Sequence, residues 1–459
     1  MDIEETDVVV IGMGPGGEDA AGRLAEAGLQ VTGVEARLVG GECPYWGCVP
    51  SKMMIRAANL LAEARRIPGM AGTYTLEADW GPVARRIRDE ATDSWDDKVA
   101  VDRFTGKGGH FVRGRGRITG QGEVTVDTAD GTRVFRPRRG VLVNTGTEPA
   151  IPPIPGLAGT PYWTNREAIE TEDVPASLIV LGGGAIGAEL AQVFARFGAS
   201  VSVVEAMPRL VPMEEPEAGD LLAEVFEREG LAVRNGTRAE QVRHDGGEFT
   251  VSLGDGSVLT GERLLVATGR GADLAAVGLG AYDLDEKAAT VRTDERMRAA
   301  DGLWAIGDIT GKGAFTHVSM YQAAIAARDI LGQDGPPAVY GAVPRVTFTD
   351  PEIGSVGLTE AQAREHGLEV RIGITQLPSS ARGWIHKPGN DGFIKLIGDT
   401  GRSVLVGATS AGPAGGEVLG ALAVAVHAQV PVGALRAMIY AYPTFHRAIE
   451  SALGDLASG

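Results

Sequence analysis

The chain has 459 residues, 44% of them hydrophobic, and its 60 acidic and 43 basic residues give a net charge of −17. This length is too great for one ordinary core and predicts about three domains, while the negative charge disfavours nucleic acid and an anionic membrane as partners. The acidic N-terminus lacks the features of a signal peptide, and no apolar run reaches the roughly 20 residues of a membrane helix, so we expect a cytoplasmic location.

The first sixth of the chain has the pattern of a dinucleotide-binding βαβ unit. Residues 7–11 are apolar, as in a buried parallel strand, and a helix is predicted at 18–27. Between them lie Gly12, Gly14 and Gly17. Such glycines form a tight turn, let the backbone approach a pyrophosphate and let helix and strand pack closely, while the helix N-terminus binds the phosphates. A second strand at 30–34 ends at Glu35, whose carboxylate can accept hydrogen bonds from a ribose.

Both cysteines of the protein, Cys43 and Cys48, lie in the stretch 40–52. A pair separated by four residues can close as a disulfide over the start of a helix, and a helix N-terminus stabilises a thiolate. The alternatives are a structural disulfide, which would close a very small loop, and a metal half-site, for which too few ligands lie nearby. A cytoplasmic location favours a catalytic pair, so a redox-active pair is the leading interpretation and no metal site is expected.

The next region alternates helices with short strands. Helices are predicted at 51–66 and at about 80–104, and short antiparallel strands with glycine turns at 110–136. A further strand ends in the Thr-Gly turn at Gly146, and the proline-rich stretch 148–156 marks a domain boundary.

The chain then repeats its first pattern. A buried strand is predicted at 178–181, and another at 201–204 ends at Glu205. The glycines of this second copy are Gly182, Gly184 and Gly187, and a second Thr-Gly turn follows at Gly269. Two dinucleotide sites in one chain are what an enzyme needs to pass a hydride from nicotinamide to flavin.

The acid of the second copy bears on the choice of nucleotide. Glu205 suits the free 2′-hydroxyl of NADH and opposes the 2′-phosphate of NADPH. The nearby Arg209 weakens this preference, and Glu205 could instead only cap the strand end.

The last third begins with a strand at 304–308 that ends in Gly-Asp at Asp308, followed by an apolar helix at 316–331. Beyond residue 339, strands are predicted at 345–349 and 392–397, and helices near Glu360, near Val418 and at 440–453.

The cysteine segment, the two glycine fingerprints and the Gly-Asp turn together resemble the FAD-dependent pyridine nucleotide-disulfide oxidoreductases over nearly the whole chain. The resemblance implies an α/β fold with two Rossmann-like dinucleotide-binding domains, for FAD and NAD, and a C-terminal α+β dimerisation domain. The implied boundaries are 1–150 and 272–338 for the FAD domain, 151–271 for the NAD(P) domain and 339–459 for the dimerisation domain. A two-fold homodimer is expected.

The resemblance also implies residue roles. By the family's scheme, NADH reduces FAD, and the flavin then reduces a disulfide between Cys48, expected against the flavin, and Cys43, the thiolate that attacks the substrate. Lys52 and Glu189 match the family's ion pair beside the flavin, although either could be a surface charge. Asp308 is expected to bind the flavin ribitol, or else only caps a helix. Further cofactor-binding positions are Gly41, Gly146 and Gly269.

The chain departs from the family's pattern beside the cysteines. Glu42 stands where relatives usually carry a threonine, and Tyr45 and Trp46 make the substrate face bulkier and more aromatic.

A larger departure lies near the C-terminus. Relatives carry His-Pro-Thr-x-x-Glu, in which the histidine is the acid-base catalyst, whereas this chain has Tyr442 at the histidine position and Arg447 at the glutamate position. Tyr442 can donate a proton but is a poor base at neutral pH. His446 and Glu450, four residues apart on an expected helix, form either a displaced pair or an ordinary surface pair.

These patterns predict an NADH-dependent FAD enzyme whose small-molecule electron acceptor is a disulfide, a quinone-like compound or a metal ion. One alternative is a dihydrolipoamide dehydrogenase with a relocated base. Another, of a different class, is a redox-responsive flavoprotein that binds a partner and has little turnover.

Overall fold

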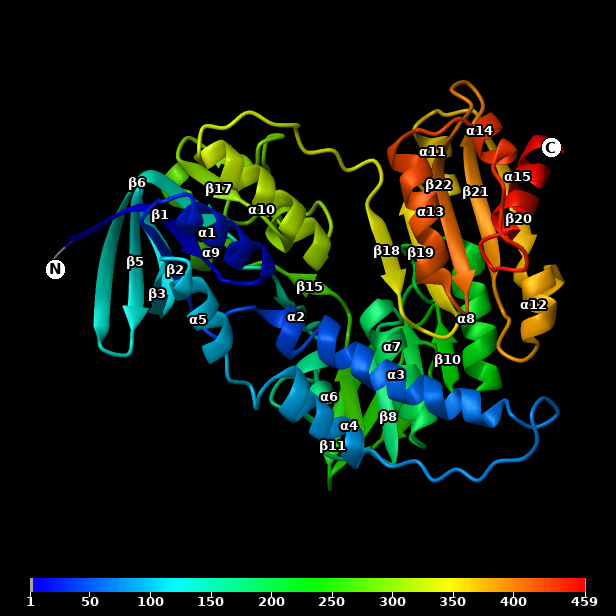
Figure 1. The fold of residues 1–459 in the computed structure, drawn as a ribbon. Coiled ribbons are helices and arrows are strands. Elements are labelled where there is room, and N and C mark those ends of the chain that lie inside the picture. Colours follow the sequence, from blue (N-terminus) through cyan, green and yellow to red (C-terminus); the bar gives the residue numbers. More distant parts are fainter. Residues whose placement is uncertain (1–2, 459) are drawn as a thin grey trace. The chain divides into compact units, whose positions relative to one another are not determined.

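The computed structural model describes residues 3–458, which fall into two units (Figure 1). The first unit comprises residues 3–50, 85–150 and 270–340, and the second comprises 51–84, 151–269 and 341–458. The helices α3 (Cys48–Arg65) and α4 (Gly81–Arg86) run across unit boundaries. None of the helices within residues 3–458 is long and apolar enough to span a membrane.

The first unit is built on a largely parallel sheet. In spatial order its main strands are β16 (Arg298–Ala300), β17 (Leu303–Ala305), β6 (Gly131–Val143), β1 (Ile3–Ile11), β2 (Val31–Glu35) and β3 (His110–Arg113). Val8 and Val10 of β1 belong to one core cluster, and Val9 and Ile11 belong to another. Because both faces of β1 are buried, its sequence is a continuous apolar run.

The remaining elements of the first unit cover or extend this sheet. Two antiparallel strands, β4 (Arg115–Gly120) and β5 (Glu123–Thr128), extend from β6, and β7 (Glu148–Pro149) pairs with β15 (Arg270–Gly271). The helices are α1 (Pro15–Glu26), α2 (Glu42–Tyr45), α5 (Lys98–Gly106), α9 (Leu274–Val277) and α10 (Thr316–Ile330). Gly16 lets α1 approach α10 closely, since a Cβ atom there would lie 2.1 Å from Ser319 Oγ.

The second unit contains a parallel sheet like that of the first. Its strands, in spatial order, are β10 (Ala232–Asn235), β9 (Ser200–Glu205), β8 (Ser177–Leu181) and β14 (Arg263–Val266). Its helices are α6 (Asn165–Glu170), α7 (Ala185–Arg196) and α8 (Pro216–Arg228). A three-stranded antiparallel sheet adds β11 (Ala239–Asp245), β12 (Glu248–Leu253) and β13 (Val258–Gly261).

The C-terminal part of the second unit is an antiparallel sheet with helices. The strand order is β18 (Pro344–Thr347), β19 (Glu352–Gly357), β22 (Val404–Gly412), β21 (Phe393–Asp399) and β20 (Val370–Gln376). The helices are α11 (Glu360–Glu365), α12 (Ala381–His386), α13 (Gly415–His427), α14 (Val432–Ala437) and α15 (Ala448–Ser458). The predicted fold class is thereby confirmed, with two Rossmann-like parts and a C-terminal α+β part.

Two helix predictions are wrong in detail. The helix expected at 80–104 is broken, because a π-helical turn at 87–91 leads into three residues, Asp93, Ser94 and Trp95, with φ between 48° and 59°. The break lets the buried Asp97 accept hydrogen bonds from Val39 N and from the Arg113 guanidinium.

The helix expected at 440–453 begins only at Ala448. Pro443 lies in the first half of the expected segment, and a proline in a helix interior removes a backbone donor and clashes with the preceding turn. His446 is therefore not on the helix.

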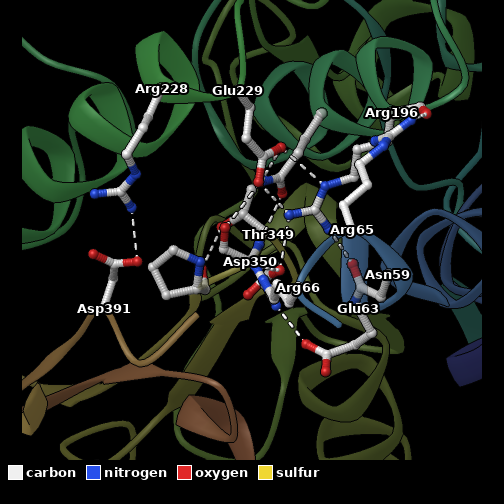
Figure 2. A network of polar contacts seen from close by, with 12 residues as sticks. Asn59, Glu63, Arg65, Arg66, Arg196, Arg228, Glu229, Thr349, Asp350 and Asp391 are labelled. Carbon is white, nitrogen blue, oxygen red and sulfur yellow. Dashed lines mark hydrogen bonds and ion pairs between the residues drawn. The ribbon is translucent and has the colours of Figure 1, made fainter. Parts of the chain in front are cut away.

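Arg196, at the end of α7, connects three parts of the second unit (Figure 2). Its side chain is only 2% exposed and bonds Glu229 after α8 (2.5 and 2.9 Å) and Asp350 before β19 (2.8 Å). Arg66, after α3, also reaches Asp350 at 2.7 Å. The nucleotide-type sheet, α3 and the C-terminal sheet are thus joined by charge-assisted hydrogen bonds.

A second ion cluster, around the buried Lys395, also joins the nucleotide-type part of the second unit to its C-terminal sheet. Lys395 of β21 is 3% exposed, and its Nζ lies 2.9 Å from Glu215, 2.7 Å from Glu217 and 3.0 Å from Glu360. Burial alone would lower the pKa of Lys395, but the hydrogen bonds to the three carboxylates outweigh it and raise the pKa. The lysine is therefore charged at neutral pH and compensates carboxylates on α8 and α11.

We expect Lys395→Met to lower the free energy of unfolding by about 3–5 kcal/mol at pH 7, because it leaves the buried Glu215 carboxylate and the more exposed Glu217 and Glu360 carboxylates without their cation. The loss should shrink toward pH 4. Burial raises the pKa of Glu360, but the hydrogen bonds to Lys395 and Arg364 outweigh burial and lower the pKa, so the stability that this group contributes is lost as the pH falls. Urea denaturation at both pH values measures the effect. Lys98→Met, which removes a fully exposed ion pair with Asp102, is the control and should change little. An equal loss at pH 7 and pH 4 would contradict the electrostatic explanation.

Candidate functional site

The first glycine loop lies between β1 and α1 and has the geometry that a pyrophosphate-binding loop requires. Gly12 has φ +91°, and a Cβ atom there would lie 2.4 Å from Asn144 O. A Cβ atom at Gly17 would lie 2.0 Å from Gly12 O, so helix and strand could not pack as they do. Gly14 is the N-cap of α1 and contributes no side chain of its own to the helix N-terminus. All three predicted glycines are therefore in place.

Glu35 fixes this loop to the end of β2. Its Oε2 accepts a hydrogen bond from Met13 N, within the glycine loop, and its Oε1 accepts one from Arg37 N, both at 2.8 Å. Burial raises the pKa of Glu35, and the two N–H groups with the charges of Arg113 and Arg37 oppose that effect. The carboxylate stands at the strand end where a ribose of a bound dinucleotide would need an acceptor.

The second glycine loop, in the second unit, repeats these contacts. Gly182 has φ +104°, and a Cβ atom at Gly187 would lie 1.9 Å from Gly182 O. Glu205 Oε2 accepts from Gly183 N and Oε1 from Met207 N, both at 2.7 Å.

Two features of this second loop concern the ligand. A Cβ atom at Gly184 would meet no atom within 4 Å, so open space lies in front of the N-terminus of α7. Arg209, the cation that weakens the expected preference for NADH, forms an ion pair with Asp220 at 2.8 Å.

The cysteine pair lies in the first unit. Gly41, with φ +66°, is the N-cap of the short helix α2 that carries Cys43, and Cys48 is the first residue of α3. The two cysteines are not joined by a disulfide in this structure. A hydrogen bond with Cys48, burial and the charge of Cys48 all raise the pKa of Cys43. Cys48 Sγ lies 3.5 Å from Thr316 Oγ1 at the start of α10.

Asp308 lies in a chain of polar contacts that reaches the cysteine segment. Thr147 Oγ1 donates to Asp308 Oδ2 at 3.0 Å, and Arg270 donates to Thr147 Oγ1 at 2.9 Å and to Thr147 O at 2.6 Å. The guanidinium of Arg270 is 3.9 Å from the Glu42 carboxylate. Burial raises the pKa of Asp308, whereas the Thr147 hydrogen bond and the Arg270 charge lower it. A positive charge thus stands between two carboxylates, one of them the unusual Glu42.

The Thr-Gly turns occupy corresponding places in the two units. Gly146 has φ +67° and Gly269 has φ +124°, and a Cβ atom at either position would meet nothing within 4 Å. Both backbone conformations favour glycine. These bare loops, the carboxylates at the strand ends and Asp308 fit an FAD in the first unit and a pyridine nucleotide in the second.

The expected pair of Lys52 and Glu189 forms within the second unit. Lys52 Nζ is 2.7 Å from Glu189 Oε2, and Glu189 Oε1 accepts from Phe348 N at 2.8 Å. The Glu189 side chain is 7% exposed, that of Lys52 is 35% exposed, and Nζ also lies 4.6 Å from the centre of the Phe348 ring. The Glu189 carboxylate therefore orients the partly exposed ammonium group of Lys52.

The C-terminal segment contains no His446–Glu450 pair within the described chain. Glu450 pairs with Arg447 at 2.9 Å, and His446 Nε2 lies 3.5 Å from Thr444 Oγ1. The Arg447 guanidinium lies 5.5 Å from the centre of the Tyr442 ring and also donates to Tyr440 O. Tyr442 is 70% exposed. The side chains at the two dyad positions, Tyr442 and Arg447, thus lie beside each other as a phenol and a cation.

Sequence reasoning did not assign roles to Thr147, Arg270, Thr316 or Arg447. Arg270 directly follows the Thr-Gly turn at Gly269, and this position was a usable signal. Thr316 and Cys48 are 268 residues apart, and no local pattern relates them.

Comparison with known proteins gives matches over nearly the whole length. Residues 6–326 match the model of the pyridine nucleotide-disulphide oxidoreductases, and residues 343–453 match the dimerisation domain of the same name, which supports a homodimer.

Individual relatives support the same family assignment. A dihydrolipoyl dehydrogenase of Chlorobaculum tepidum is 33% identical over 98% of this chain and 96% of its own. A mercuric reductase of Shewanella putrefaciens is also 33% identical, over 95% of this chain and 78% of its own. Among solved structures, a Cu(II) complex of the HOCl-induced flavoprotein disulfide reductase RclA from Escherichia coli aligns with a TM-score of 0.85 and 25% identity, covering 100% of this chain and 99% of that one.

The open space at Gly184 gives a prediction about nucleotide binding. Gly184→Ala should fold normally, because φ is −70° and the added methyl group meets no atom, but it should weaken NADH binding about tenfold or more, equivalent to 1.4 kcal/mol. Calorimetric titration and a melting curve measure the two effects. Gly187→Ala, whose methyl group would overlap Gly182 O, should instead destabilise the fold. Unchanged NADH affinity of a folded Gly184→Ala variant would mean that this loop does not hold the pyrophosphate.

Proposed function

The chain belongs to the pyridine nucleotide-disulphide oxidoreductase family, and we propose that this FAD-dependent enzyme passes electrons from NADH through the Cys43–Cys48 pair to a small acceptor other than lipoamide. The observation that carries the choice of acceptor is the C-terminal segment, where Tyr442 and Arg447 stand at the two dyad positions. Oxidation of a dithiol such as dihydrolipoamide needs a base that takes up its protons. A cation beside a phenol does not provide one.

The proposed electron path gives each site residue a role. FAD, when bound, would supply the hydride and electron transfer that connects the nicotinamide to the disulfide. Glu35 and Asp308 would accept hydrogen bonds from the sugar parts of that cofactor, and Lys52, oriented by Glu189, would offset negative charge on it. The chain's own thiols then carry the electrons: Cys48 receives them first, and Cys43 presents them to the acceptor.

A thiophilic metal ion is the acceptor class that this site suits best. A metal ion is bound by thiolates and reduced by electron transfer, so it requires no proton from a base. The matches to a mercuric reductase and to a Cu(II)-complexed disulfide reductase support this class. Small disulfides and quinone-like compounds are the other acceptors, and Tyr45 and Trp46, with ring centroids 5.9 Å apart, could stack against a flat molecule.

A dihydrolipoyl dehydrogenase is the second candidate, favoured by 33% identity over nearly the full length. It would need His446 or another group to act as the base. NAD⁺ reduction by dihydrolipoamide separates the two candidates.

The decisive experiment follows NADH oxidation by the purified flavoprotein under anaerobic conditions with Cu(II), Hg(II), small disulfides and quinones. We expect turnover with at least one metal ion or small disulfide, loss of that turnover in Cys43→Ser, and poor turnover with lipoamide. Turnover with lipoamide far above that with all other acceptors would favour the second candidate.

Nucleotide preference gives a separate prediction. Because Glu205 opposes a 2′-phosphate and Arg209 is paired with Asp220, kcat/KM should favour NADH over NADPH at least tenfold, or about 1.4 kcal/mol. Steady-state kinetics with both nucleotides measure the ratio, and Glu205→Ala should reduce it. A tenfold preference for NADPH would show that another cation overrides Glu205.

The dimer gives a further prediction. If Tyr442 completes the cysteine site of the partner subunit, a mixture of inactive Cys43→Ser chains and inactive Tyr442→Ala chains should regain about a quarter of wild-type activity once subunits mix at random. Heterodimers then carry one intact composite site. No recovery, with heterodimers detected by mass spectrometry and each parent variant shown to be inactive, would mean that Tyr442 does not contribute to catalysis across the interface.

A further inference from the structure

The start of α10 brings a hydroxyl group to the redox-active cysteines. Thr316 is the first residue of this 15-residue helix, and its Oγ1 lies 3.5 Å from Cys48 Sγ. The Thr316 hydroxyl also lowers the pKa of Cys43, against the stronger effects of Cys48 and burial that raise it. One hydroxyl thus reaches both sulfurs of the pair.

The position of Thr316 is fixed by the packing of α10 behind it. Gln322 Oε1 accepts a hydrogen bond from Gly307 N at 2.6 Å, and Gln322 Nε2 donates to Thr310 Oγ1 at 3.1 Å. Gln322 is fully buried, and Ser319 packs against the glycine face of α1. The helix start is therefore held in place, and the hydroxyl needs no rearrangement to meet the sulfur.

The two sulfurs have unequal surroundings. Cys43 is partly buried, and its pKa is raised by Cys48, whereas Cys48 is exposed and begins the 18-residue helix α3. Reduction of the disulfide breaks the S–S bond, takes up two electrons from NADH by way of FAD, and binds one proton. The dipole of α3 favours the negative charge on Cys48, at the N-terminus of that helix, so the proton is expected on the partly buried Cys43.

We propose that Thr316 is a positioning residue of the reductase, whose hydroxyl donates a hydrogen bond to the Cys48 thiolate and thereby stabilises the reduced cysteine pair. This inference rests on the pair being redox-active, but not on the identity of the acceptor. A hydrogen bond to a charged group is stronger than one between neutral groups. Its loss shifts the thiol-disulfide equilibrium toward the disulfide.

The test uses the purified flavoprotein with Thr316→Val, which keeps the shape and removes the hydroxyl, and Thr316→Ser, which keeps the hydroxyl. Each protein is equilibrated anaerobically in dithiothreitol buffers of graded redox ratio, quenched with acid and alkylated. Mass spectrometry then counts the thiols at positions 43 and 48. Thr105→Val is the control, because this exposed threonine of the same unit bonds only locally, to Asp102 O.

We expect Thr316→Val to require about a tenfold more reducing buffer for half-reduction, equivalent to about 30 mV for a two-electron couple. Thr316→Ser and Thr105→Val should match the wild type. If Thr316→Val does not fold or does not retain FAD, Thr316→Ala takes its place.

Two results would overturn the proposal. Either Thr316→Val has the wild-type midpoint, or Thr316→Ser is shifted as far as Thr316→Val, so that the hydroxyl is not the cause. A wild-type protein that dithiothreitol reduces normally but NADH does not reduce would instead count against the proposed function. The buffer equilibrium still decides the role of Thr316 in that case.

Discussion

Two carboxylates hold the nucleotide-binding architecture of this chain together. Glu35 and Glu205 each stand at the end of the second strand of a βαβ unit, and each accepts one hydrogen bond from its glycine loop and one from the residue two places further along the chain. The loops are rich in glycine, so these contacts help to determine their shape. If the same carboxylates bind a ribose, as proposed, fold and cofactor binding depend on the same groups.

Much of this arrangement was predictable from the sequence because it is local. Gly17 and Gly187 are required by close contacts with the turn five residues earlier, and Gly12 and Gly182 have a positive φ in that turn, so the local pattern was enough to place them. The Lys52–Glu189 pair also forms. It joins distant segments, and it could be predicted only because the resemblance to a known family supplied it. Residue roles in catalysis remain predictions.

Two of the failures share one physical cause. The break in the helix at 80–104 serves Asp97, which binds groups on two other elements, and the position of Thr316 beside Cys48 depends on contacts across 268 residues. Local propensity contains no information about such partners. At 440–453 the proline itself was visible, and the helix prediction gave it too little weight.

The sequence departs from that of the family's dithiol enzymes at the dyad positions, where Tyr442 and Arg447 stand, and beside Cys43, at Glu42, Tyr45 and Trp46. The proposed electron path still runs through the cysteines. The proposed function requires that electrons from NADH reach Cys43 and Cys48. Anaerobic titration of the oxidised flavoprotein with NADH, followed by thiol counting, tests this directly, since the chain holds no other cysteines. The account predicts that both thiols appear as NADH is consumed. Flavin reduction by NADH without the appearance of thiols would contradict it.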